Sequence, residues 1–122
     1  LLSITSFSLL RKGSIMQFDL KDIVPPRILK GDYLWPNELS TYQDRRGNTV
    51  MLIPDGFLMP GQSDGGIYAV VNPTSIYTKP VRITAPKDGW FYHRAMYVEL
   101  PGGNQGILTA RATKPLFGEG KG

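Results

Sequence analysis

The chain contains one histidine, His93, so any imidazole-based acid or base catalysis would have to use it. Its nearest carboxylates in the sequence are Asp88 and Glu99. His93 lies within an aromatic stretch that has the composition of a strand. The favoured interpretation of His93 is therefore an ordinary strand residue with no catalytic role. With one histidine and no cysteine, the chain also lacks the several nitrogen or sulfur ligands that zinc takes. We therefore expect no catalytic residue, no zinc site and no cofactor.

Three acids, Asp55, Asp64 and Glu99, could be imagined as the carboxylate pair that glycoside hydrolysis requires. Two of them stand directly before a glycine, in the dipeptides Asp55-Gly56 and Asp64-Gly65. Such dipeptides are typical of tight turns, because Asp and Gly both tolerate turn conformations. The sequence thus predicts turns at these two aspartates rather than a pair of catalytic acids.

Aromatic residues gather between Trp90 and Tyr97, and flat rings of this kind can stack on sugars or bases while an arginine adds hydrogen bonds. Because strand residues alternate between two faces, one face of this stretch can be buried while the other meets solvent. The predicted ligand-binding residues are Phe91, His93, Arg94 and Tyr97.

The composition is that of a globular protein, with 41% hydrophobic and 20% charged residues in a chain of 122. The net charge of +4 suits an anionic partner, but the basic residues are scattered along the chain instead of forming a stripe, which disfavours nucleic acid. The apolar start, Leu1 to Leu10, is much shorter than the roughly 20 residues of a membrane-spanning helix. We expect one small domain without a membrane span.

Fourteen glycines and ten prolines divide the chain into short segments, and the segments between these breakers resemble strands. Residues 1–36, in which Pro25-Pro26 bars a helix, are predicted to be an irregular lead-in, and residues 37–122 a β-repeat region. Val50–Ile53 and Ile67–Val71 should pair antiparallel. Further strands are expected at 81–85, 90–100 and 107–110.

Strict alternation would place the residues of 90–100 on two faces of a central strand that is covered on both sides. Trp90, Tyr92, Met96, Val98 and Leu100 form one set. The other set is Phe91, His93, Ala95, Tyr97 and Glu99.

The chain contains an internal repeat: the dipeptide Gly47-Asn48, followed by an apolar strand, recurs as Gly103-Asn104, followed by another apolar strand. The repeat offset is the distance from position 47 to position 103. The chain would hold one full and one partial repeat. A unit with three or four strands has the size of a β-propeller blade, about 40–50 residues. Blades cannot cover both of their own faces, so further repeats or oligomeric neighbours would be needed. The predicted fold is all-β and antiparallel, with one to two propeller-like blades; the alternative is a small β-sandwich or barrel.

Two segments carry a resemblance: Met96–Leu100, which leads into the Gly/Asn turn, and Gly106–Ala112, which follows it. Together they resemble a degenerate FG-GAP or VCBS-type propeller repeat, and the resemblance covers Gln43 to Val71 and Tyr92 to Gly122. It implies a seven-bladed propeller used chiefly for extracellular recognition or adhesion, or as a lectin-like or enzyme-associated module.

The family implied by this resemblance holds calcium in a loop of Asp and Asn residues, and calcium takes six to eight oxygen ligands. In the second unit the loop is rich in Gly and Pro, and its weak metal candidates are Glu99 and Asn104, apart from Gln105. The first unit offers Gln43, Asp44 and Asn48 beside Arg45 and Arg46, which would repel a cation. We expect no tight calcium site in either unit.

The leading functional hypothesis is a non-enzymatic recognition or structural module that binds protein or carbohydrate, with an extracellular location favoured. One alternative is part of a propeller-type hydrolase or lyase whose active centre is assembled from several blades. A second is a basic β-barrel that binds nucleic acid.

Overall fold

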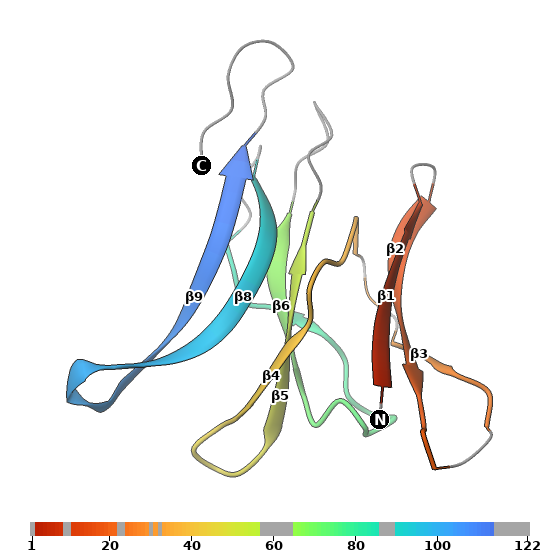
Figure 1. The fold of residues 1–122 in the computed structure, drawn as a ribbon, viewed down its shortest axis with the longest axis horizontal. Helices are drawn as coiled ribbons and strands as arrows, with labels where there is room; N and C mark the ends of the chain where they lie inside the picture. The colour runs from red at the N-terminus through yellow and green to blue at the C-terminus, as the bar shows by residue number, and fades with distance from the viewer. Residues whose placement is uncertain are drawn as a thin grey trace.

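The structure, a computed structural model, is all-β and antiparallel, as the sequence predicts. The residues that it describes form nine strands in three sheets (Figure 1). None of these residues belongs to a helix of the length and apolarity that a membrane crossing demands. The described residues are 2–8, 11–21, 24–29, 31, 33–56, 65–85 and 90–113.

The first sheet is a three-stranded meander of β1 (Leu2–Ser8), β2 (Arg11–Phe18) and β3 (Arg27–Leu29). The prediction of an irregular lead-in is therefore wrong for these residues. Pro25 and Pro26 do exclude a helix, but they stand just before β3 and leave its backbone free to pair. Strand β2 alternates between buried and half-buried side chains, the pattern of a strand with one face on a core.

The second sheet is a four-stranded meander in the order β4-β5-β6-β7. The predicted pairing of the two apolar runs is confirmed, because Val50 lies opposite Val71 and Ile53 opposite Tyr68. The edge strand β7 is shorter than the predicted 81–85, since only two residues of that segment pair. The strands are β4 (Ser40–Gln43), β5 (Thr49–Asp55), β6 (Gly66–Val71) and β7 (Val81–Arg82).

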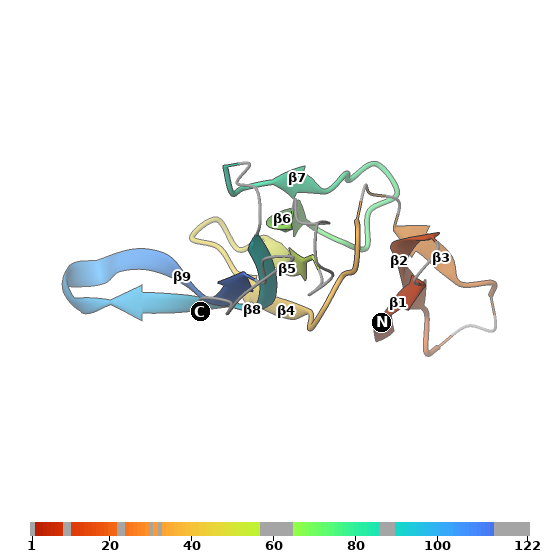
Figure 2. The same cartoon turned by 90° about the horizontal axis from the view of Figure 1, so that it is seen from above.

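The third sheet is a long hairpin of β8 (Trp90–Leu100) and β9 (Asn104–Thr113), joined by a short turn at Pro101–Gly103. The strand predicted at 90–100 is confirmed, but it is not central: in the described part of the chain β8 pairs with β9 alone. The three sheets follow one another in sequence order, with β4–β7 between the other two (Figures 1 and 2). The backbone N–H of Gly65 donates to the carbonyl of Trp90 at 3.0 Å and ties the hairpin to the central sheet.

A β-bulge interrupts the hairpin at His93. Tyr92 pairs with Arg111 and Arg94 with Ala110, so His93 is the extra residue of β8. The bulge moves all later residues to the opposite face, and Tyr92 and Ala95 consequently share one buried cluster although they are three positions apart. The predicted strict alternation of faces along 90–100 is wrong for this reason.

The core lies on both faces of the central sheet, and β5 contributes to each of its two halves. One buried cluster, between the first two sheets, contains Ile15, Leu29, Tyr33, Met51, Ile53 and Val70. The other, between the central sheet and the hairpin, contains Leu52, Ile67, Tyr92 and Ala95. The central residues of β5, Val50–Ile53, are all apolar because this part of the strand is covered on both sides.

Asp55 is the last residue of β5 and is fully buried, so its prediction as a turn residue is wrong, whereas Asp64 lies outside the described residues. Its carboxylate accepts hydrogen bonds from the backbone N–H groups of Leu34 at 2.9 Å and Trp35 at 2.7 Å. The connection between the first two sheets is thereby fixed against the end of β5, where Pro36 also forms a bridge with Asp55.

Candidate functional site

The four residues predicted to bind a ligand do not form one patch. Phe91 is buried, so it is wrong as a surface-binding residue. His93 and Arg94 are exposed, and the Arg94 guanidinium lies 3.1 Å from the carboxylate of Glu38. Of the four, Tyr97 lines a pocket on the described surface. The bulge at His93 separates Phe91 from Tyr97, because it lies between them and reverses the faces of β8.

Tyr97 stacks on a second tyrosine, Tyr42 of β4. The two rings are stacked, with an interplanar angle of 8° and centroids 4.4 Å apart. The hydroxyl of Ser40, two residues before Tyr42 and on the same face of β4, donates to the carbonyl of Ala95 at 2.6 Å. This bond fixes the distance between β4 and β8 at which the two rings meet.

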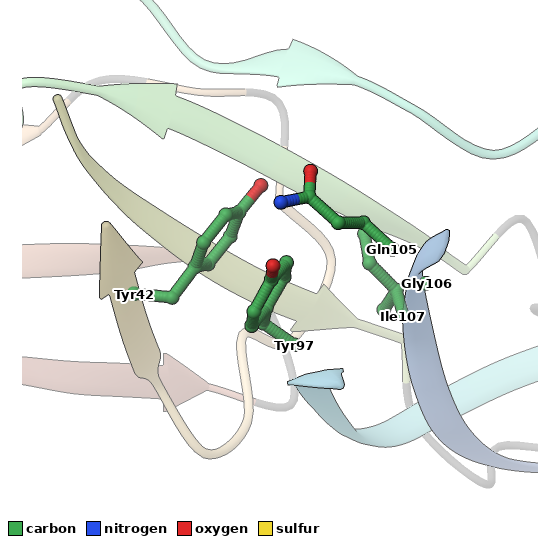
Figure 3. Close-up of a pocket in the computed structure, with 5 residues that line it drawn as sticks. All are labelled: Tyr42, Tyr97, Gln105, Gly106 and Ile107. Carbon is green, nitrogen blue, oxygen red and sulfur yellow. The ribbon is translucent and has the colours of Figure 1, made fainter. Parts of the chain in front are cut away.

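An open pocket of about 370 Å³ lies beside the stacked rings (Figure 3). Its lining comes from β4, β8 and β9: Tyr42, Tyr97, Gln105, Gly106 and Ile107. Figure 3 shows the Gln105 amide reaching toward the hydroxyl end of Tyr42. The pocket thus combines ring surfaces with an amide that both donates and accepts hydrogen bonds.

The hydroxyl of Tyr97 donates a hydrogen bond to Glu99 at 3.4 Å. Partial burial and the neighbouring carboxylate both raise the pKa of Tyr97, because each disfavours the phenolate. The Arg45 guanidinium donates to the carbonyl of Gly103 and links the turn of the β4–β5 hairpin to that of the β8–β9 hairpin. The two hairpins that carry the tyrosines are therefore joined by two hydrogen bonds, from Arg45 to Gly103 at their turns and from Ser40 to Ala95 along their strands.

The weak metal candidates do not converge. Asn104 lies opposite Leu100 and Glu99 opposite Gln105 in the hairpin, so Glu99 and Asn104 belong to opposite faces. Among the residues that the structure describes, no three His, Cys, Asp or Glu side chains are grouped to hold a metal ion.

In the first unit, the carboxylate of Asp44 is occupied by its own turn. It accepts hydrogen bonds from the backbone N–H groups of Arg46 and Asn48, both at 2.8 Å, and from the Asn48 side chain at 3.0 Å. These bonds, those from Asn48 first, lower the pKa of Asp44. The aspartate thus organises the β4–β5 turn, an Asx-type arrangement that uses both carboxylate oxygens.

Of the residues that line this pocket, the sequence predicted Tyr97 as a ligand-binding residue but not Tyr42, Gln105 or Ile107. One signal for Tyr42 was present: each of the two tyrosines precedes its own Gly-Asn turn by a similar number of residues. The turn glycines Gly47 and Gly103 also share a positive φ, of 78° and 75°. Aligning the hairpins on these glycines would have placed the tyrosines at related positions.

No family model, curated protein or solved structure matches this chain.

Proposed function

We propose that this chain is a non-enzymatic recognition module of a repeat-built β protein, and that the pocket beside Tyr42 and Tyr97 binds a sugar residue. The observation that carries the proposal is the composition of the pocket, in which tyrosine rings and the amide of Gln105 line one open cavity. Sugars are bound by flat rings against their C–H faces and by amides that exchange hydrogen bonds with their hydroxyl groups.

The sheet arrangement supports the repeat-built part of the proposal. The central sheet is a four-stranded antiparallel meander, the form of a propeller blade. Each sheet packs its face on the next in sequence order, and the chain passes from the last strand of one sheet to the first strand of the following one. The FG-GAP-like or VCBS-like identity remains part of the proposal and rests on the resemblance around the second hairpin.

The alternatives have less support. The described lining of the pocket contains no carboxylate pair, which a glycoside hydrolase would require. For nucleic acid, free arginines would be needed, but four of those described are engaged within the chain: Arg27 with Pro73 and Thr74, Arg45 with Gly103, Arg94 with Glu38, and Arg111 over the Trp90 ring.

The test is saturation-transfer NMR on the full chain with a panel of glucose, galactose, mannose, N-acetylglucosamine and their short oligomers. We expect at least one sugar to bind, and Tyr97→Ala to weaken that binding about tenfold, or about 1.4 kcal/mol. Tyr97→Phe keeps the ring and should retain most of the affinity. Tyr77→Ala removes a tyrosine that is 87% exposed and outside the pocket, and it should bind like the unmodified chain.

The proposal fails if no sugar of the panel binds at millimolar concentration. It fails equally if the Tyr97→Ala and Tyr77→Ala variants bind a sugar with the same affinity, because the binding site would then lie elsewhere.

A further inference from the structure

The outer face of the β8–β9 hairpin is apolar and uncovered in the described part of the chain. Directly paired residues project from the same face, so Met96 and Leu108 form one outward pair, and Leu100 lies on the same side. All three are exposed, Leu108 by 60%. The alternate positions, among them Ala95 and Tyr97, face the central sheet.

A second apolar face lies at the other end of the stack. In the first sheet Ile15 and Leu29 pair and are buried against the central sheet. Met16 and Ile28 pair at the next position and therefore project outward, away from the core. Ile28 is 55% exposed, and Met16 is half-buried. Figures 1 and 2 show the first sheet and the hairpin on opposite sides of the central sheet.

We propose that these two faces bind each other between copies of the chain. The outward face of the β1–β3 sheet in one copy would pack on the outward face of the β8–β9 hairpin in the next. Exposed apolar faces mark interaction surfaces. Within the chain, both faces of the central sheet are already covered by other sheets, so the contact between copies continues a packing that the chain uses twice.

The chemistry of the two faces fits a sheet of this chain as the partner. The described outward residues from Met96 to Leu108 carry no charge, and neither do Met16 and Ile28. The next outward residue along β8, Arg94, is paired with Glu38. Because the two faces differ, the contact is head-to-tail, and successive copies either close a ring or extend as a fibre. The pocket residues Tyr97 and Gln105 lie on the opposite face of the hairpin, so this association is independent of the proposed sugar site.

The test is sedimentation velocity of the full chain over a concentration series. We expect the unmodified chain to shift from monomer to larger species as concentration rises. Leu108→Glu and Ile28→Glu each place a charge on one face, and each variant alone should remain monomeric. An equimolar mixture should form dimers and nothing larger, because each variant keeps one intact face and the two faces are complementary. Both positions are largely exposed, so the variants should unfold at the temperature of the unmodified chain.

Ile76→Glu is the matched control, because Ile76 is 74% exposed and lies between β6 and β7, outside both faces. It should associate like the unmodified chain. Four results would overturn the proposal: a monomeric unmodified chain at all concentrations, association that survives Leu108→Glu, loss of association in the Ile76→Glu variant, or a mixture of the two face variants that stays monomeric.

Discussion

The buried carboxylate of Asp55 gives the sharpest test of how this fold is held together. It is the acceptor for two backbone N–H groups, those of Leu34 and Trp35, in the connection between the first sheet and the central sheet. Asp55→Ala removes both acceptors and leaves little room for water, since the residue is fully buried. The connection would then carry two unpaired donors.

The magnitude follows from those two donors. A buried polar group left without its partner costs about 1–3 kcal/mol, so the two donors together should lower the free energy of unfolding of Asp55→Ala by about 2–6 kcal/mol. Asp55→Asn keeps one oxygen acceptor and turns an amide N–H₂ toward the second donor. We expect it to lose about half as much.

Urea or guanidinium unfolding, followed by circular dichroism, measures the loss. Asp44→Ala is the control, because Asp44 also accepts backbone N–H groups, but in an exposed turn where water replaces the lost acceptor. Its effect should be clearly smaller than that of Asp55→Ala. Equal losses in the two variants would refute the view that burial of the Asp55 hydrogen bonds sets their importance.

The pH dependence of stability, compared between the unmodified chain and the Asp55→Asn variant, tests the ionisation of the Asp55 carboxyl group. Burial raises the pKa of Asp55 above its ordinary value of 3.8, against the backbone hydrogen bonds that lower it. A raised pKa means that the protonated form favours the fold, so this contribution is complete below the unfolded pKa and is lost as pH rises through the folded pKa. The stability of the unmodified chain relative to Asp55→Asn should therefore fall as pH rises from about 4. A difference that stays constant or increases over this range would contradict the assignment.

Two further substitutions probe the interior. Tyr33→Phe should raise the free energy of unfolding by about 1 kcal/mol in a denaturant titration, because the Tyr33 hydroxyl is buried with no hydrogen-bond partner among the described residues; a clear loss of stability would mean that the hydroxyl has one. Gly65→Ala should cost about 3 kcal/mol, since a Cβ there would lie 2.5 Å from the carbonyl oxygen of Trp90 and 2.6 Å from that of Asp55. Gly106→Ala, whose nearest neighbour would be 3.4 Å away, should unfold like the unmodified chain, and equal behaviour of the two alanine variants would contradict the packing described.

The strands that the sequence predicts well are those whose signals are local. Val50–Ile53 and Ile67–Val71 are apolar runs closed by Pro, Gly or Asn, and they form the paired centre of the fold. Strands β1 to β3 were missed because no turn residue separates β1 from β2 and because the stability of this sheet comes from packing Ile15 and Leu29 on the distant β5. Such long-range packing leaves little trace in a local pattern.

The roles of two individual residues, Asp55 and Tyr97, show the same limit of local patterns. Asp55-Gly56 has the local signature of a turn, yet the approach of the segment at Leu34 and Trp35 makes Asp55 a buried acceptor. Tyr97 was identified from its aromatic neighbourhood, whereas Tyr42 acquires its role only when β4 and β8 meet. Composition points to one half of a site when its other half lies on a strand far away in the sequence.

The bulge at His93 links the two proposals. In a regular strand Tyr92 and Ala95 would lie on opposite faces, and with Tyr92 buried against the central sheet, Tyr97 would point away from Tyr42. The extra residue reverses the order: Ala95 and Tyr97 turn inward, and Met96 turns outward. The single inserted position therefore creates the tyrosine stack and, by the same displacement, moves the apolar side chains of β8 to the outer face. Any function of the pocket and any function of the outer face depend on one feature of the backbone.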